Sequence, residues 1–276
     1  MTAEPTYSTV RGIIRLLLIA VAMALLFPFF LVVIGLGSLF GTQSRYGVSM
    51  WLTAVWCGIV ARLMGVRINT QGERHPDARL FIGNHVSYLD ILVSGRTVGG
   101  VFVSRHDVRD WPVMGIFARI GGTIFLDRTS LRSAVKSSKM VVDKMHHGAR
   151  ITLFPEGGTT EGGRVDSFKP FMFNTVAGSD VLVQPFVILY THIAGEPTTL
   201  ANRDFAYWHR PDEPFMPHAW RVLRLRSITA QLQFLAPLPS PISADKMILR
   251  EYAEGMQQRI AEHVPPLLPA AQPIPA

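Results

Sequence analysis

The stretch RLFIGNHVSYLDILVS, residues 79–94, carries the clearest signal of secondary structure in the chain. It begins with an apolar run of strand length, RLFIG (79–83), and passes through a polar turn into a second apolar run, YLDILVS (88–94). A short β-rich run, a polar turn and a helical run in that order predict a strand that ends in a loop and is followed by a helix. His85 and Asp90 lie five residues apart across that loop.

The same alternation continues along the rest of the chain. Further runs of strand character are GVFVS (100–104), TIFLD (123–127), RITLF (150–154), VLVQPFVILY (181–190) and ITAQLQFL (228–235). Apolar residues at helical spacing lie between 131 and 145, and Gly148 follows as a stop. We therefore predict an α/β fold with a mixed, largely parallel sheet flanked by helices, whose active site lies in loops beyond the strand ends.

The N-terminal part is apolar and predicts a membrane-embedded helical segment. No charged residue occurs between Leu16 and Ser44, and a bilayer span needs about 20 apolar residues. Pro28 lies mid-run and predicts a kink, so the segment is either a kinked single span or a hairpin that enters one leaflet and returns. A second, more amphipathic helix, about 46–65, is expected along the interface. A cleaved signal peptide is the rival, but the run is longer than a signal core and no A-x-A site follows.

These patterns divide the chain into three parts. Residues 1–66 are the predicted membrane-anchoring helices, 67–262 the α/β domain, and 263–276 a Pro/Ala-rich tail that we expect to be disordered.

Charge and composition narrow the function classes. The net charge is +7, yet only 17% of residues are charged, which suits an anionic membrane surface. No zinc-finger spacing, RNP-like motif or dense basic tract is present, so we expect no nucleic-acid partner. The single cysteine, Cys57, forms no disulfide within the chain, and the absence of a Cys/His cluster predicts no metal.

The NHVSYLD stretch (84–90) allows two interpretations. Ser87-x-x-Asp90 matches a capping box that opens a helix and leaves His85 as an ordinary loop residue. Alternatively, Asp90 accepts the Nδ1 proton of His85, which leaves Nε2 free to act as a base. Since no G-x-S-x-G elbow supplies a nucleophile, the hydroxyl activated by such a base would belong to a substrate.

Three further stretches carry polar residues at predicted strand ends or prolines within strands. They are GGTIFLDR with Arg128, LFPEGG with Glu156, and VQPFVILY with Pro185. Each has an ordinary explanation, as a surface charge, a glycine turn and an edge strand, respectively.

Taken together and in this order, the stretches resemble the glycerolipid acyltransferase family, the lysophosphatidate-acyltransferase-like enzymes. The resemblance covers about residues 67–238. The first family block, N-H-x-x-x-x-D, is matched by Asn84, His85 and Asp90, and the second, G-x-I-F-(I/L)-x-R, by Gly122, Ile124, Phe125, Leu126 and Arg128. The third, F-P-E-G-T-R, is matched by Phe154, Pro155, Glu156 and Gly157, and the fourth, V-x-P-(V/F)-x-I, by Val183, Pro185, Phe186 and Ile188. A P-x-x-G spacer is matched by Pro112 and Gly115.

The resemblance implies transfer of an acyl group from an acyl-CoA or acyl-carrier-protein thioester to the free hydroxyl of a lysolipid. His85 is then the general base and Asp90 its orienting partner. The implied acceptor-binding residues are Arg128, Glu156, Gly157, Thr159, Thr160 and Lys169, and the implied supporting residues are Asn84, Pro155 and Pro185. Apart from the thioester co-substrate, no cofactor and no metal are implied. The implied location is the inner (cytoplasmic) membrane, with the catalytic domain facing the cytoplasm.

The third block departs from the family pattern. Where the family has Thr-Arg, the chain has Gly158-Thr159-Thr160, so the arginine that helps to hold a phosphate is absent. Either Arg164, Lys169 or Arg128 compensates, or the acceptor has no phosphate. The run from PEG to FK (155–169) and the later PHAWRVL (217–223) resemble the branch that acylates lyso-ornithine lipid. Both 1-acylglycerol-3-phosphate and lyso-ornithine lipid are therefore candidate acceptors.

Two other classes of function compete with this one. A non-catalytic membrane lipid-binding protein on the same fold would be favoured if His85 or Asp90 were replaced, and both are present. A lipid or thioester hydrolase would use water in place of the lipid hydroxyl. The absent nucleophile elbow and the predicted membrane anchor count against a hydrolase.

Overall fold

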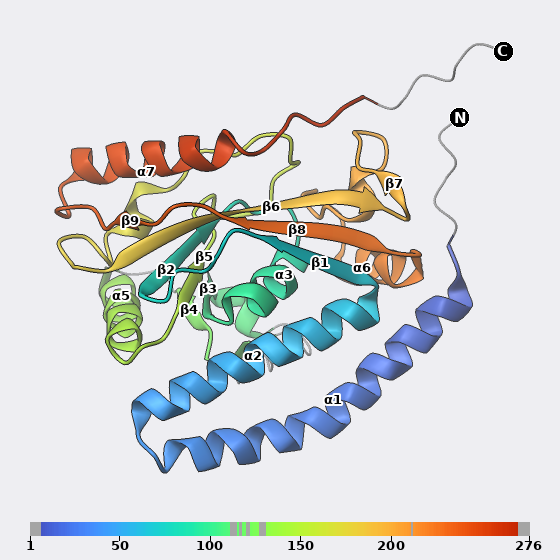
Figure 1. Ribbon diagram of the computed structural model, residues 1–276, viewed down its shortest axis with the longest axis horizontal. Helices are drawn as coiled ribbons and strands as arrows, with labels where there is room; N and C mark the ends of the chain where they lie inside the picture. Colours follow the sequence, from blue (N-terminus) through green and yellow to red (C-terminus); the bar gives the residue numbers. More distant parts are fainter. Residues whose placement is uncertain are drawn as a thin grey trace.

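The computed structural model describes residues 7–110, 115, 118–119, 122–126, 131–210 and 212–269. Its centre is a mixed sheet with helices on both faces, and two long N-terminal helices lie outside one of these faces (Figure 1). The strands are β1 (Val66–Gln71), β2 (Ala78–Gly83), β3 (Val101–Arg105), β4 (Ile124–Leu126), β5 (Ile151–Leu153), β6 (Leu182–Ile193), β7 (Glu196–Pro197), β8 (Ile228–Phe234) and β9 (Leu238–Pro239).

The strand order β1-β8-β6-β2-β5-β3-β4 confirms the predicted mixed, largely parallel sheet. The pairs β1/β8, β6/β2, β2/β5, β5/β3 and β3/β4 are parallel, whereas β6 pairs with β8, β7 and β9 in the antiparallel sense. Each of the predicted strand runs became a strand. The additional edge strand β1 was not predicted, because VRINTQ carries only two apolar residues.

Pro185 lies in a central strand, so the edge-strand explanation of VQPF is wrong. β6 lies between β2 and β8, and Pro185 is opposite Ile82. The Pro185 carbonyl accepts a hydrogen bond from Leu235 N (2.9 Å), so its missing N–H would face the β8 side of the strand. Since β8 ends at Phe234, the β6/β8 pairing loses no hydrogen bond through the missing N–H of Pro185.

The helices are α1 (Thr9–Ser38), α2 (Thr42–Met64), α3 (Leu89–Val98), α5 (Leu131–His146), α6 (Phe215–Arg224) and α7 (Lys246–Ala261), with short 3₁₀ turns at His106–Asp110, Pro170–Phe173 and Arg203–Phe205. The pleat of β2 directs its alternate side chains to two cores. Phe81 joins the core beneath α2 and α3, while Leu80 and Ile82 join the core beneath α5 and α7.

Helices α1 and α2 form an antiparallel hairpin that starts and finishes at the α/β domain (Figure 1). α1 runs through Pro28 without a break. Its start is tied to the domain by the guanidinium of Arg15, which donates to the carbonyls of Leu223 (3.1 Å), Leu225 (2.8 Å) and Arg226 (3.0 Å). The chain therefore does not turn back at Pro28 within the apolar run, as the hairpin interpretation expected; it turns back at residues 39–41, between α1 and α2.

α2 lies between α1 and the domain except at the start of α1, which contacts α6 directly. Near the start of α2 the Tyr46 ring lies 6.3 Å from the His147 ring, and in its middle Met50 Sδ accepts a bond from Arg150 N. Both helices are long and apolar enough to cross a membrane, but the most apolar window is 33% buried in α2 and only 6% buried in α1. α1 is therefore the outer and more exposed layer of the hairpin.

The tail differs in part from its predicted disorder. Residues 263–269 are described, and Leu268 O accepts a hydrogen bond from Leu200 N (2.9 Å). Leu267 packs against the core beneath α2 and α3. Leu267, Val264 on the other core, and the backbone bond to Leu200 thus hold a segment whose composition alone suggested a free chain.

Candidate active site

The loop between β2 and α3 brings His85 and Asp90 together. His85 Nδ1 lies 2.8 Å from Asp90 Oδ2, in the geometry that the pairing interpretation required. Asp90 is in the first turn of α3 and fully buried, while the His85 side chain retains 18% exposure. The imidazole is therefore accessible, and its carboxylate partner is shielded from water.

Asp90 is held by four hydrogen bonds. Oδ2 accepts from His85 Nδ1 and from the backbone N–H groups of Val86 (2.7 Å) and Ser87 (2.9 Å). Oδ1 accepts from the hydroxyl of Tyr190 (2.6 Å). The bond from Ser87 N is half of the predicted capping box. The other half is absent, because Ser87 Oγ accepts from Leu89 N (3.2 Å) instead of Asp90 N. Asp90 therefore both shapes the loop and orients the histidine.

Tyr190 is a site residue that the sequence analysis missed. It comes from β6, is buried, and donates to Asp90 across a sequence distance of 100 residues. Burial, followed by the charge of Asp90, raises the pKa of Tyr190 well above its ordinary value, so the hydroxyl stays protonated as a donor. Its position at the end of an otherwise apolar run, VILY, was the available signal.

The loops after β2 and β5 meet because these two strands are parallel neighbours. Phe154 follows β5, and its ring stacks on the His85 ring with centroids 4.3 Å apart and an interplanar angle of 14°. Asn84 joins the end of β2 to β6 by two bonds with the Ile188 backbone, of 3.0 and 2.8 Å. The imidazole is thus fixed on one face by an aromatic ring and at Nδ1 by a carboxylate.

Glu156 ties the histidine loop to the glycine-rich loop. Its Oε1 accepts from His85 N (2.7 Å) and its Oε2 from Asp166 N (2.9 Å). Burial raises the pKa of Glu156 to about 8, against the opposing effect of these two backbone bonds. The resemblance implied that this carboxylate binds the acceptor. To do so, its two oxygens would have to accept from the acceptor as well as from His85 N and Asp166 N.

Replacing Glu156 with glutamine is expected to remove a pH dependence of turnover. In the wild type, loss of the proton near pH 8 lets both oxygens accept the two backbone N–H groups, so kcat/KM should rise as pH approaches about 8. Glutamine has one acceptor oxygen, which leaves one N–H unpaired at every pH and costs about tenfold in kcat/KM. A pH–rate profile of both proteins checks this. A variant profile that still rises between about pH 7 and 8 would assign the titration to another group.

The glycine-rich loop continues this framework. Thr160 donates to His85 O through both its N–H (2.8 Å) and its hydroxyl (3.2 Å). Gly157 has φ of 83°, which disfavours a side chain, and a Cβ there would meet the Lys169 stem at 3.9 Å. Pro155 O accepts from Lys169 N (2.9 Å). Of the predicted acceptor-binding residues, Thr160 therefore contacts His85, while Gly157 and Lys169 lie against each other in the same loop region.

The remaining predicted residues lie elsewhere or are not described. Thr159 is half-buried in the same loop. Pro185 lies within β6 rather than in a loop. Arg164, the proposed compensating cation, is exposed and pairs with Glu161 (3.6 Å) and Asp166 (3.4 Å). Arg128 and Pro112 lie outside the described residues.

The segment PHAWRVL (217–223) supports the histidine loop from α6. His218 is fully buried, with its Nδ1 3.1 Å from the Tyr88 hydroxyl and its Nε2 3.0 Å from Tyr207 O. Trp208 N donates to Val86 O (3.0 Å). This part of the resemblance thus has a structural role next to the site.

The arrangement provides a base without a protein nucleophile. No hydrogen bond occupies His85 Nε2 within the described part of the chain, and the nearby hydroxyl of Ser87 donates to Ala206 O (2.7 Å). The same part contains no group of His, Cys, Asp and Glu side chains that could hold a metal. The geometry can therefore deprotonate a hydroxyl brought by a substrate.

Comparison with known proteins agrees with this chemistry. Residues 67–189 match the family model described as Acyltransferase. The chain is 33% identical over 210 residues to the lyso-ornithine lipid O-acyltransferase of Brucella abortus, covering 73% of this chain and 77% of that protein. It is 25% identical over 198 residues to the 1-acyl-sn-glycerol-3-phosphate acyltransferase of Neisseria meningitidis, covering 71% and 75%.

A solved structure shares the fold. The crystal structure of the 1-acyl-sn-glycerophosphate acyltransferase of Thermotoga maritima superposes with a TM-score of 0.63 at 19% identity, covering 92% of this chain and 97% of that one. The ordered blocks, the His85–Asp90 pair and these relatives lead to one conclusion: the chain belongs to the acyltransferase family that includes the lyso-ornithine lipid and 1-acyl-sn-glycerol-3-phosphate acyltransferases.

Proposed function

We propose that this chain transfers a fatty acyl group from an acyl-CoA or acyl-carrier-protein thioester to the free hydroxyl of a lysolipid. The observation that carries the proposal is the His85–Asp90 pair, with Nδ1 bound at 2.8 Å and Nε2 left for a substrate. Nε2 takes the hydroxyl proton while the oxygen attacks the thioester carbonyl. The C–S bond then breaks, the imidazolium returns the proton to the leaving thiolate, and an ester and a free thiol remain. Asp90 stabilises the imidazolium between the two transfers.

We propose further that the acceptor is lyso-ornithine lipid, whose head group has no phosphate. Thr159 and Thr160 stand where a phosphate-binding arginine is usual, and threonine hydroxyls cannot replace the charge-assisted bonds of a guanidinium. Arg164 is already paired with two carboxylates. The similarity to a protein named as a lyso-ornithine lipid O-acyltransferase supports the same choice. The second candidate is 1-acylglycerol-3-phosphate, favoured by the exposed Lys169 beside Gly157.

Mass spectrometry of the products tests both proposals. Purified protein receives one acyl donor and equal amounts of lyso-ornithine lipid and lysophosphatidate, and ornithine lipid is expected to dominate. Strong preference for lysophosphatidate that is retained in Thr160→Ala but lost in Lys169→Ala would contradict the acceptor assignment. In that case Lys169 would bind the phosphate in place of the arginine that the family usually has in the third block. Arg164→Ala, which removes a paired surface arginine, is the matched control.

We propose that the hairpin anchors the protein in the inner (cytoplasmic) membrane with the catalytic domain in the cytoplasm. Acyl-CoA and acyl carrier protein are cytosolic donors, and both ends of the hairpin lie against the domain. Reporter fusions after Gly65 and at the C-terminus are therefore expected to report cytoplasmic positions. A periplasmic signal at either position would remove the hairpin proposal.

A further inference from the structure

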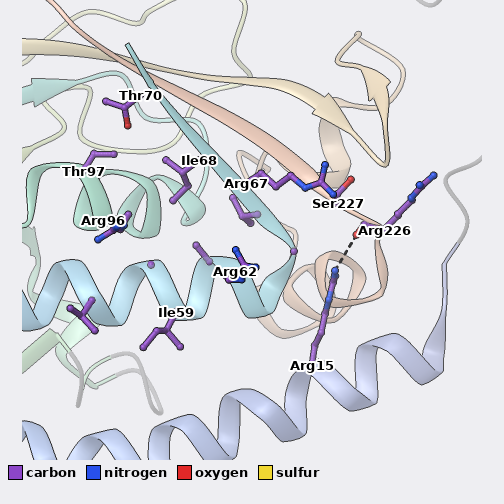
Figure 2. A pocket seen from close by; sticks show the side chains of 15 residues that line it. Arg15, Ile59, Arg62, Arg67, Ile68, Thr70, Arg96, Thr97, Arg226 and Ser227 are labelled. Carbon is purple, nitrogen blue, oxygen red and sulfur yellow. Dashed lines mark hydrogen bonds between the residues drawn. The ribbon is translucent and has the colours of Figure 1, made fainter. Parts of the chain in front are cut away.

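A cavity of about 1100 Å³ lies at the base of the hairpin (Figure 2), and His85 is not among its lining residues. Its walls come from α1, α2, β1, the end of α3 and the turn before β8. None of the residues assigned above to catalysis or acceptor binding lines it. The cavity is therefore separate from the active-site loops, although α3 contributes to both.

Arginines dominate the polar lining, and no acidic residue contributes. The lining arginines are Arg15, Arg62, Arg67, Arg96 and Arg226. Arg15 is occupied by the carbonyls of Leu223, Leu225 and Arg226. Within the described ranges the guanidinium groups of the other four make no ion pair and no hydrogen bond to the protein. These four side chains are exposed, so they line the open rim of the cavity as solvated cations without a protein counter-charge.

The chain makes room for this cluster. A Cβ at Gly58 would lie 2.8 Å from Arg96 Cδ, so the Arg96 stem crosses α2 at a residue without a side chain. The cluster draws on four different elements, because Arg62 is on α2, Arg67 on β1, Arg96 on α3, and Arg226 precedes β8. Tertiary folding therefore brings these four arginines to one surface. No single basic run in the sequence would predict this.

The remaining lining is apolar and continues into the hairpin. Val55, Ile59, Val66 and Ile68 form this part of the wall. α1, next to the cavity, exposes apolar residues such as Leu17 (60%) and Val21 (55%). If α1 lies among acyl chains, its first turns and the cavity lie at the depth of the lipid head groups. At that depth the arginines would face anionic lipid head groups, and the apolar wall would face the start of the acyl chains. This combination suits a lipid that carries a negative charge.

We propose that this cavity binds the phosphate-bearing head group of an anionic membrane phospholipid that is not a substrate. Charge-assisted bonds to the phosphate come from neighbouring guanidinium groups, Arg62 with Arg96 at one end of the cavity or Arg67 with Arg226 at the other (Figure 2), and the apolar wall takes the start of the acyl chains. Occupation of this site would hold the domain at a fixed orientation on an anionic membrane. An acidic protein surface is a weaker match, because a concave site with apolar walls would leave those walls uncovered.

Vesicle binding by the full-length protein tests the proposal. Vesicles contain phosphatidylcholine alone or with phosphatidylglycerol, and the measured quantity is the affinity ratio between the two. Arg62→Gln/Arg96→Gln is expected to lower this ratio about 25-fold, from roughly fivefold for each lost charge near the surface. The matched control, Arg259→Gln/Lys246→Gln, removes two exposed cations from α7 on the opposite face of the sheet and is expected to leave the ratio unchanged (Figure 1).

Equal losses of the affinity ratio in the two double variants would overturn the proposal, because only the net charge of the protein would then matter. An unchanged ratio in both variants would overturn it as well. If the first variant fails to fold, Arg67→Gln/Arg226→Gln takes its place. Inorganic phosphate at matched ionic strength is expected not to displace the vesicles. Full displacement would mean a free-phosphate site and reject the lipid. Loss of binding to acyl carrier protein, with vesicle binding intact, would reject it in favour of a protein partner.

Discussion

His85→Ala is expected to lower acyl transfer about 10²- to 10⁴-fold while the protein remains folded. In the proposed mechanism the imidazole is the base, and no hydrogen bond from the described residues occupies its Nε2; its partners Asp90 and Phe154 are expected to stay in place when it is removed. Initial rates with a thioester donor and lysolipid measure the loss. The melting temperature and the far-ultraviolet circular dichroism report whether the fold is kept.

His192→Ala is the matched control for that loss. His192 lies on β6, two residues beyond Tyr190, and its side chain is exposed. Its removal is expected to leave the rate unchanged. Transfer by His85→Ala within a few-fold of the wild type would contradict the assignment of His85 as base.

Asp90→Asn is expected to cost about 10²- to 10⁴-fold in kcat/KM, close to the loss of the base itself. An asparagine oxygen can still accept the N–H groups of Val86 and Ser87, so the loop keeps most of its shape. The lost charge no longer stabilises the imidazolium, and the amide no longer selects the tautomer. The large effect therefore falls on turnover rather than on folding.

Tyr190→Phe separates charge from packing at the same carboxylate. It removes the 2.6 Å bond to Oδ1 but leaves the negative charge of Asp90. The loss in kcat/KM is expected to be about tenfold, the value of one hydrogen bond to a charged group.

If Asp90→Asn melts at a much lower temperature yet turns over normally, Asp90 is only a helix cap and the pairing interpretation fails.

Much of the fold could be predicted because its strands are short, apolar and separated by polar turns. RLFIG, RITLF and VLVQPFVILY each became a strand, and their parallel pairing follows from the helices between them. β1 escaped prediction because an edge strand with one exposed side needs few apolar residues. Sequence also could not show that α2 lies flat on the domain, since its contacts reach residues about 50 to 100 positions away.

The pairing of His85 with Asp90 was within reach of the sequence, because both residues lie in one local turn. Tyr190, the stacking of Phe154 on His85 and the bond from His85 N to Glu156 all cross between strands. Such contacts depend on strand order and register, which a single sequence does not specify. The motif residues were therefore recognised, but the roles of Phe154 and Glu156 in holding the histidine were not.

Thioester consumption with and without lysolipid, followed together with product mass, distinguishes acyl transfer from its two rivals. Transfer to a lipid hydroxyl predicts thiol release that requires lysolipid, matches the diacylated lipid mole for mole, and disappears in His85→Ala. A hydrolase would release thiol and free fatty acid without lysolipid, and a non-catalytic lipid-binding protein would release neither. Either of those two results would contradict the account.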